Sequence, residues 1–277
     1  MVIEPERGFL SINFKEILAA RELLFLFIKR DFLSRYRQTL LGPLWFVLQP
    51  LLTSFVFAGI FSKVTRIPTD RIPAPLFYFC GLLIWNYFSQ CVSSVAKALV
   101  TNADLFKKVY FPRLIIPFAA AVSPLVTFLV QLATFLIFYL YLHRFTPTGT
   151  DFHPNFFVCW LPFLLLQTLA LGLGIGLWIS VLTVRYRDLQ HLIGALLQLW
   201  MYLTPIIYPA SVFPAKWRFL TSLNPMSPVI EFYRYAFFGQ GFVHPAGLAA
   251  GVFVTILILV SGMLVFNKVE RTFVDTI

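Results

Sequence analysis

Charged side chains are scarce in this 277-residue chain, at 12% of the residues, whereas hydrophobic residues make up 59%. Water-soluble domains contain about 25% charged residues and about 45–50% apolar ones. A chain with half the usual charge cannot cover a surface that faces water. The composition therefore excludes a soluble globular protein and predicts an integral membrane protein.

Six long stretches contain no aspartate, glutamate, lysine or arginine. Each has room for one helix across the hydrocarbon, which takes roughly 20 apolar residues, and none comfortably holds two. Outer-membrane barrels show alternating segments of about 10 residues instead. We therefore predict an all-α, polytopic fold with six transmembrane helices in a single domain, residues 1–277. The stretches are 38–62, 72–96, 114–143, 152–184, 189–215 and 235–267, and prolines between the last two confine those spans to 189–210 and 245–267.

The lack of charge at membrane depth also excludes classes of function. An intramembrane enzyme needs titratable or nucleophilic groups there, and a proton- or sodium-coupled transporter usually places Asp or Glu in its spans. Glu231 is the one acid close to a span, and we expect it at the membrane interface. The chain also lacks the Gly-x-x-x-x-Gly-Lys-Ser/Thr loop that cradles ATP phosphates. A conduit powered by another subunit, or a structural membrane protein, remains.

Cysteine and histidine are too sparse to suggest a disulfide or a metal site. Cys80 and Cys91 fall in one predicted helix, about 16 Å apart at 1.5 Å per residue, and a disulfide needs Cα atoms within about 7 Å. The four histidines lack the spacing of metal ligands. Three glycines in the fourth span do form a pattern, and we expect them to give a close-packing face for another helix. They are Gly172, Gly174 and Gly176.

Lysine and arginine are distributed unevenly among the segments that connect the spans. If both termini are cytoplasmic, the inner segments carry fifteen of these residues and the outer segments seven. Cytoplasmic loops are enriched in Lys and Arg, so we predict both termini inside, although residues 63–71 form an unusually basic outer loop. The net charge of +10 is therefore mainly a topology signal.

Two cytoplasmic segments are predicted to be helical. Over residues 14–37 we place Ile17, Leu24, Phe25, Ile28 and Phe32 on one apolar stripe, as in a helix that lies along the membrane surface. Such a helix could anchor the first span or serve as a platform for a partner. Residues 101–113 form a second candidate, with Thr101 and Asp104 as a capping box. We favour a docking element here over a plain turn, because a turn would not need Phe106, Tyr110 and Phe111.

Residues 205–245 are the most irregular part of the chain. Six prolines interrupt the segment, with several aromatic residues between them. Glu231 and Arg234 are three residues apart, so they can pair on one helical face. This composition predicts short helices at the outer membrane interface.

Short motifs follow one another in a fixed order from about residue 14 to the C-terminus. They are Arg35-Tyr36-Arg37-Gln38, Leu41-Gly42-Pro43-Leu44-Trp45, Leu48-Gln49-Pro50, Lys107-Lys108-Val109-Tyr110-Phe111-Pro112-Arg113, Val184-Arg185-Tyr186-Arg187-Asp188, Thr204-Pro205-Ile206-Ile207-Tyr208-Pro209, Leu223-Asn224-Pro225-Met226 and Glu270-Arg271-Thr272-Phe273. In this order the chain resembles type-2 ABC permeases that export polysaccharides, most of all the membrane subunits of O-antigen exporters and next those of teichoic-acid exporters.

This resemblance implies a half-transporter of the bacterial inner membrane: a homodimer of six-span subunits with two copies of a separate cytoplasmic ATPase that binds ATP and Mg. It implies a coupling helix at 102–110, a second contact at 185–190, an interface helix that frames them, and outer gate helices within 211–244. The coupling residues would be Asn102, Ala103, Asp104, Leu105, Phe106, Lys107, Lys108, Tyr110, Arg185, Tyr186, Arg187 and Asp188, the interface residues Lys29, Arg30, Arg35 and Arg37, and the gate residues Pro214, Trp217, Asn224, Pro225, Glu231 and Arg234.

The predicted substrate pathway rests on a further hypothesis, that the first and fifth spans face the conduit. Sugars present C–H faces to aromatic rings, and a sliding glycan needs many weak contacts. The predicted cargo is a lipid-linked, O-antigen-like polysaccharide that moves outward; teichoic-acid or capsular polysaccharide export and, from another class, an intramembrane glycosyl- or acyl-transferase are the alternatives. The predicted pathway residues are Trp45, Gln49, Trp200, Tyr202 and Tyr208.

Overall fold

The protein is entirely helical over the part that the structure describes. A computed structural model describes residues 21–36, 42–102, 105, 112–145, 153–186, 188–212, 214, 223–241 and 243–273. The α-helices are α2 (Arg21–Tyr36), α3 (Trp45–Phe57), α4 (Ala74–Thr101), α6 (Ile115–Val122), α7 (Pro124–Phe145), α8 (Leu161–Arg185), α9 (Leu189–Leu203), α11 (Met226–Phe238) and α12 (Pro245–Phe273). Shorter helical turns are η1 (Gly42–Leu44), the π-helix η2 (Ala58–Val64), η4 (Phe156–Trp160) and η5 (Ala210–Val212).

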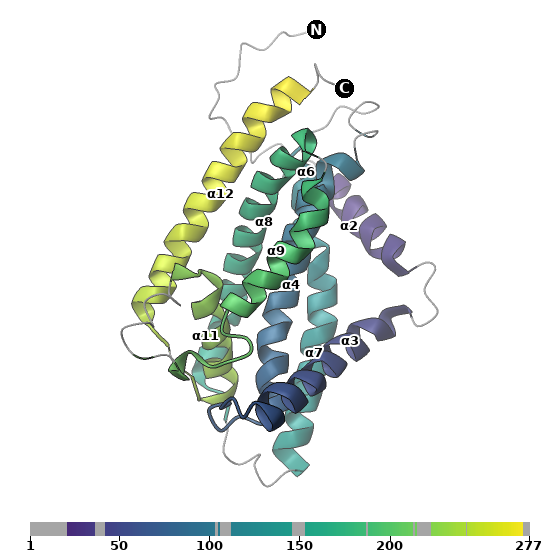
Figure 1. The fold of residues 1–277 in the computed structure, drawn as a ribbon. Helices are drawn as coiled ribbons and strands as arrows, with labels where there is room; N and C mark the ends of the chain where they lie inside the picture. Colours follow the sequence, from purple (N-terminus) through teal and green to yellow (C-terminus); the bar gives the residue numbers. More distant parts are fainter. Residues whose placement is uncertain are drawn as a thin grey trace.

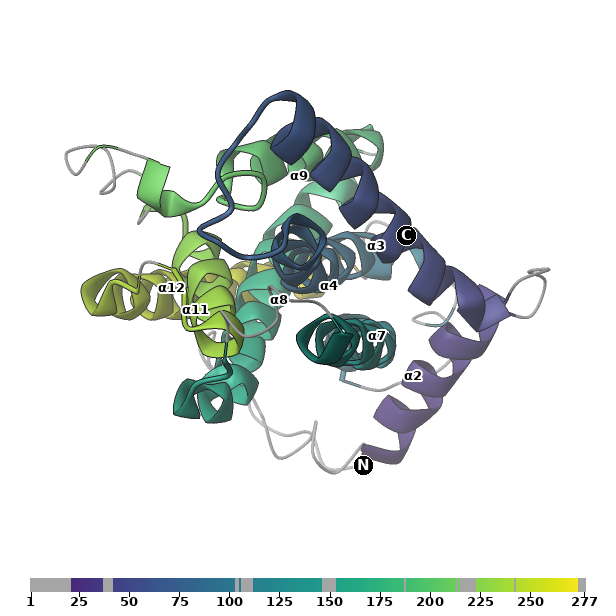
Figure 2. The same ribbon diagram turned by 90° about the horizontal axis from the view of Figure 1, so that it is seen from below.

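Helix α4 is the centre of the bundle. Of its 28 residues, 18 are buried, and the other long helices surround it when the bundle is viewed along its length (Figure 2). The main hydrophobic cluster gathers around the N-terminal part of α4, and a second cluster joins its C-terminal part to α2, α6, α8 and α12. The fold is therefore built around a helix that the rest of the chain largely encloses.

Four helical stretches of the described residues are long and apolar enough to cross a membrane: Trp45–Val64, Ile115–Phe145, Phe156–Val184 and Pro245–Val269. They correspond to the predicted first, third, fourth and sixth spans, so the all-helical, polytopic fold is confirmed. The predicted second span is α4, which has the length but carries polar residues such as Asn86 and Gln90 on faces that other helices partly cover.

The predicted fifth span is shorter than expected. Helix α9 has 15 residues, about 22 Å at 1.5 Å per residue, against a hydrocarbon core of about 30 Å. Thr204 has an extended backbone (φ −100°, ψ 143°), because a residue before proline disfavours the helical region and Pro205 has no N–H to continue the hydrogen-bond ladder. The rest of the predicted span, up to residue 210, is not α-helical. We call the irregular segment of residues 204–212 the reversal after α9.

The elements sort into the two ends of the bundle (Figure 1). Helices α2 and α6, the turn between α8 and α9, and the last turns of α12 lie at the upper end in that view. The loop between η2 and α4, the last turns of α7 and the helix α11 lie toward the lower end. Segments predicted to be cytoplasmic therefore gather at one end, and segments predicted to be outside gather at the other.

The predicted close-packing glycines of α8 face two helices rather than one. A Cβ on Gly172 or Gly176 would lie 2.7 Å from the Cys91 sulfur or 2.5 Å from the Val95 Cβ, both on α4. A Cβ on Gly174 would lie 2.8 Å from the backbone of Leu259 on α12. Because residues two apart point to different sides of a helix, this short glycine pattern lets α8 approach both neighbours.

Candidate functional site

Helix α2 lies against α6 at the end of the bundle where the predicted cytoplasmic segments gather. Phe27 is buried in the second hydrophobic cluster, and Leu23, Leu24 and Ile28 pack against that cluster. Phe25, which we expected on the same apolar stripe, is 66% exposed. Phe25 therefore does not pack inside the chain, and its place on a stripe that faces the membrane surface stays a prediction.

Arg30 connects α2 to the start of the predicted coupling helix. Its Nη2 donates a hydrogen bond to Oδ1 of Asn102 at 2.9 Å, and its guanidinium group lies over the Phe27 ring at 4.9 Å and pairs with Asp31. Lys29 is exposed. Of the other predicted interface residues, Arg35 is described only for its backbone and Arg37 lies outside the described residues.

Asn102 ends α4 and begins the segment that follows. Its backbone N–H and its Nδ2 both donate to the carbonyl of Ala98, at 3.3 and 2.9 Å, and its own carbonyl accepts from the N–H of Leu105 at 3.0 Å. Thr101 is the last residue of α4, so it does not begin the next helix as the expected capping box requires. Outside the described residues lie Ala103, Asp104, Phe106, Lys107, Lys108 and Tyr110, so the coupling helix stays a prediction.

The second predicted cytoplasmic contact is the tight turn between α8 and α9. Tyr186 is 53% exposed, and its carbonyl accepts from the N–H of Leu189 at 3.2 Å. Asp188 directly precedes α9, and its carbonyl accepts from the N–H of His191 at 3.1 Å. The side chain of Arg185 and all of Arg187 lie outside the described residues. The turn presents at least one aromatic and one acidic side chain at this end of the bundle.

The predicted pathway residues divide into exposed and packed ones. Trp45 and Tyr202 are 48% and 45% exposed, and Gln49 is exposed beside Trp45 on α3. Trp200 instead packs edge-on against Trp85 and Phe88 of α4, at 6.2 and 5.2 Å between ring centroids. Tyr208 is partly buried, and its hydroxyl donates to the carbonyl of Tyr202 at 3.1 Å. Helices α3 and α9 lie along the same side of the molecule in both views (Figures 1 and 2).

The predicted gate helix forms, but it is inside the bundle. Helix α11 covers Met226–Phe238, and 11 of its 13 residues are buried. Glu231 is 3% exposed and Arg234 is 1% exposed, so protein encloses both charges, and the depth of Glu231 in the membrane stays a prediction. The apolar and aromatic residues around the pair pack on α4, α8 and α12. This packing places the two charged side chains inside the bundle.

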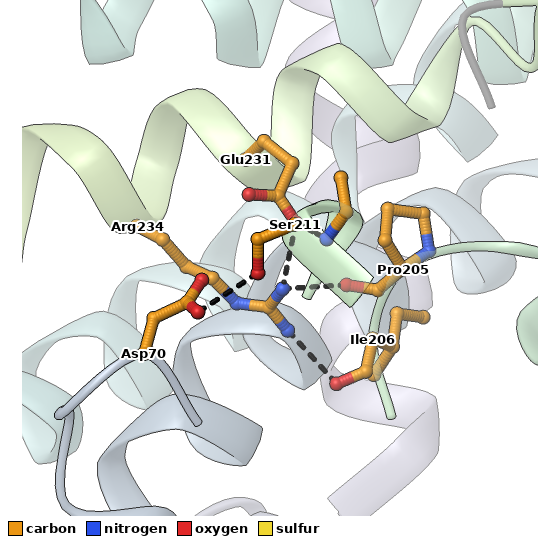
Figure 3. A network of polar contacts seen from close by, with 7 residues as sticks. Asp70, Pro205, Ile206, Ser211, Glu231 and Arg234 are labelled. Atoms are coloured by element: carbon orange, nitrogen blue, oxygen red, sulfur yellow. Dashed lines mark hydrogen bonds and ion pairs between the residues drawn. The ribbon is translucent and has the colours of Figure 1, made fainter. Parts of the chain in front are cut away.

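Glu231 and Arg234 form the expected ion pair, and they also hold the irregular reversal after α9 (Figure 3). Nη1 of Arg234 donates to Oε1 of Glu231 at 3.0 Å and to the carbonyl of Pro205 at 2.6 Å, and its Nη2 donates to the carbonyl of Ile206 at 2.8 Å. Oε1 of Glu231 accepts from the N–H of Ala210 at 3.1 Å. Side chains of α11 thus satisfy backbone groups that a continuous α9 would have satisfied itself.

The guanidinium group of Arg234 is enclosed on its remaining sides by α4. It lies over the Phe77 ring at 3.6 Å from the centroid, a cation–π contact, and a Cβ on Gly81 would lie 3.0 Å from its Nη2. Burial lowers the pKa of Arg234, and the carboxylate of Glu231 raises it in part. Because an arginine does not lose its proton in proteins, the site contains a permanent cation.

Two further hydrogen bonds attach neighbouring segments to this region. Nδ2 of Asn224 donates to Oγ1 of Thr204 at 2.8 Å, and its Oδ1 accepts from the N–H of Met226 at 3.1 Å. Oγ of Ser211 donates to Oδ1 of Asp70, in the loop after η2, at 2.8 Å. Of the other predicted gate residues, Pro225 is buried and precedes α11, Pro214 is exposed, and Trp217 lies outside the described residues.

The contacts that Arg234 makes with the reversal and the bond that Ser211 makes with Asp70 differ in strength. Removing one partner of a buried ion pair costs about 3–5 kcal/mol, because the other charge stays buried without compensation. A single hydrogen bond contributes about 0.5–1.5 kcal/mol, and the bond between Asp70 and Ser211 is exposed. The contacts of Arg234 therefore fix the reversal to α11 much more firmly than Ser211 fixes it to the loop after η2.

Sequence reasoning found the charged pair but missed several residues around it. Phe77 and Gly81 are ordinary members of an apolar run, and Asp70 belongs to a basic loop that we interpreted only as a topology signal. The prolines at 205 and 209 were a usable signal for an irregular segment, since such backbone needs partners from elsewhere in the chain.

Comparison with known proteins agrees with the resemblance to type-2 ABC permeases. Residues 22–238 match the family model described as ABC-2 type transporter. The chain is 30% identical over 266 residues to "O-antigen export system permease protein RfbA" of Myxococcus xanthus, across 95% of this chain and 98% of that protein. It is 27% identical over 254 residues to a protein of the same description from Klebsiella pneumoniae, across 92% and 94%. It is also similar to "Polysialic acid transport protein KpsM" of Escherichia coli, at 28% identity over 232 residues and 83% of each chain.

Proposed function

Because the chain belongs to the ABC-2 type transporter family, we propose that it is the permease subunit that carries a lipid-linked, O-antigen-like polysaccharide outward across the bacterial inner membrane. The observation that carries the proposal is its similarity to O-antigen export permeases over 92% or more of both chains. The described helices are consistent with a conduit, since they offer long apolar spans and an exposed face on α3 and α9 with few charges.

The energy for export comes from a separate ATPase subunit, as in any ABC transporter of this family. The sequence has no phosphate-binding loop, so ATP and Mg bind to that partner. Two copies of the partner dock on the end of the bundle that holds α2, Asn102 and Tyr186. The hydrogen bond between Arg30 and Asn102 supports this assignment, because it joins the interface helix to the first residue of the coupling segment.

The conduit forms between two copies of the chain that face each other through α3 and α9. Helix α9 buries only Ile193 and Leu197 within one copy, and its exposed residues include His191 and Gln198. A Cβ on Gly194 would meet nothing within 4 Å. Polar side chains on an apolar helix are costly in lipid, so this face fits a polar conduit or a second copy better than it fits lipid.

Both termini are cytoplasmic, as the charge distribution predicts. The lysines and arginines favour this orientation by fifteen to seven, and the segments counted as cytoplasmic gather at one end of the bundle (Figure 1). The loop after η2 and the reversal after α9 then lie toward the periplasm.

Reconstitution tests the proposal. Vesicles that contain both this chain and its ATPase partner should move lipid-linked O-antigen polysaccharide across the bilayer only when ATP is supplied, and the purified chain alone should not hydrolyse ATP. ATP turnover by the rigorously purified single chain, or export without the partner, would contradict the proposal.

A second cargo has an observation in its favour. The similarity to polysialic acid transport proteins covers 83% of both chains, so a capsular polysaccharide is the competing substrate. Offering both glycans, each on its lipid carrier, to the same vesicles decides between them, and we expect the O-antigen-like glycan to be exported faster.

A further inference from the structure

We infer that, of the two helices predicted to line the conduit, α3 is the one that moves at the outer end, whereas the outer end of α9 is held in place by Arg234 as a positioning residue. The inference rests on the proposed function, since it assigns the motion within the same export cycle. It follows from how differently the two helix ends are attached to α11.

The outer end of α9 is attached through buried, charged contacts. The two carbonyls that follow closely after α9, those of Pro205 and Ile206, both accept from Arg234, and the N–H of Ala210 is bound by Glu231. Thr204 is bound by Asn224, just before α11. To move α9 away from α11 would leave a buried cation and several backbone groups unsatisfied, which is the most costly change available in this region.

The outer end of α3 is attached much more weakly, through the loop after η2, to the reversal after α9. Between the described residues of the loop after η2 and of the reversal, the hydrogen bond from Ser211 to Asp70 is a direct link, and it is exposed. Water can replace an exposed hydrogen bond at little cost. The two attachments therefore differ in kind, and a force applied to the outer gate would break the bond to Asp70 first.

Two features of α3 itself favour motion. It contains Pro50 and ends in a seven-residue π-helix, a rare conformation that is frequent at functional sites. The loop that follows has three residues other than glycine at positive φ, Arg66, Asp70 and Arg71, at 57°, 49° and 63°, so its present conformation is strained and opening can relieve that strain.

Two engineered disulfides separate the motions of the two helices. Both pairs replace side chains that are now hydrogen-bonded at 2.8 Å: Asp70→Cys with Ser211→Cys ties the loop of α3 to the reversal, and Thr204→Cys with Asn224→Cys ties the end of α9 to α11. Both are made with Cys159→Ser, because Cys159 is the exposed native cysteine among the described residues. Each variant is reconstituted with its ATPase partner, and export is compared before and after oxidation of the same sample.

We expect oxidation to abolish export in the first variant, with recovery on reduction, and to leave export in the second variant equal to that of its reduced form. The inference is overturned if the oxidised first variant exports normally, or if oxidation stops only the second. Failure of the proposed function looks different, because then neither variant exports the glycan in its reduced form and neither does the unaltered chain.

A distance measurement tests the same inference without a cross-link. Spin labels are placed on exposed positions, one pair on Val64→Cys and Val212→Cys and the other on Leu203→Cys and Leu223→Cys, where the native side chains are 79%, 50%, 72% and 61% exposed. Labelled chains are diluted with unlabelled chains so that only distances within one copy are measured. With ATP trapped in the partner, the first distance should lengthen and the second should stay constant; the reverse pattern, or no change in the first distance, contradicts the inference.

Discussion

At the scale of single residues, Arg234 has the most demanding surroundings in the described structure. Its guanidinium group serves a carboxylate and two backbone carbonyls, in addition to the face of Phe77. A planar group with five donors can do this, whereas a lysine carries a point charge that cannot reach all of these acceptors in the same geometry. The charge and the shape of the side chain therefore both matter.

We predict that Arg234→Lys and Arg234→Gln destabilise the protein and that the second change costs more, about 3–5 kcal/mol, because it leaves the negative charge of Glu231 buried without a compensating cation. Glu231→Gln should cost less than Arg234→Gln, since the amide oxygen can still accept from Ala210. Thermal unfolding of the purified chain in detergent measures this order. Arg144→Gln, at an exposed position of α7, is the control and should leave the transition unchanged.

Arg30 supports a second prediction at this scale. Arg30→Ala removes the hydrogen bond to Asn102 and should weaken the binding of the ATPase partner, because the start of the coupling segment is then less well fixed. Arg21→Ala removes an exposed charge at the first described turn of the same helix and serves as the matched control. Binding of the purified ATPase to vesicles of each variant, measured at two salt concentrations, separates the loss of the hydrogen bond from a general loss of positive charge. Equal affinities for the two variants would contradict a special role for Arg30.

At the scale of helices, the glycines of α8 determine how closely it approaches its neighbours. An alanine at position 176 places its Cβ 2.5 Å from that of Val95, and overpacking of this kind typically costs about 1–3 kcal/mol. The same change at Gly59, where a Cβ meets nothing within 4 Å, should be harmless or slightly stabilising, because alanine favours helix over glycine by about 1 kcal/mol. Thermal unfolding of Gly176→Ala and Gly59→Ala compares the two directly, and equal transition temperatures would show that α8 and α4 adjust freely.

The sequence predicts most of the helices but not their depth in the bundle. Runs without charge located every long helix, and Pro205 predicted where the regular part of the fifth span ends. Hydropathy could not reveal that α11 is enclosed, because the residues that bury Glu231 belong to α4, α8 and α12, and the backbone groups that it and Arg234 bind lie more than twenty residues earlier in the chain. The polar residues of α4 likewise gave no indication that this helix lies at the centre of the bundle. Such features come from tertiary packing, which a local pattern does not encode.

At the scale of the whole molecule, the exposed side of α3 and α9 distinguishes a conduit from a lipid-facing surface. Tyr202 on α9 and Tyr141 on α7 are 45% and 58% exposed, so they are comparable except for the face on which they lie. We predict that Tyr202→Ala slows polysaccharide export at matched expression, whereas Tyr141→Ala does not, because only the first would remove a stacking surface for the glycan. Vesicle export assays with both variants measure the difference. An equal effect of the two changes would argue against an aromatic path along α9.

The central position of α4 has a consequence for how the chain is made. A helix that is mostly enclosed by protein, and that carries Asn86 and Gln90 among apolar residues, has a weak tendency to leave the translocon for lipid by itself. Synthesis of α4 ends at residue 101, whereas α8, which packs along it, begins at residue 161. We therefore expect the nascent α4 to stay near the insertion machinery, or against α3 and α6, until α8 emerges. Changes that weaken the contact between α8 and α4 would then lower the yield of inserted protein before they have any effect on transport.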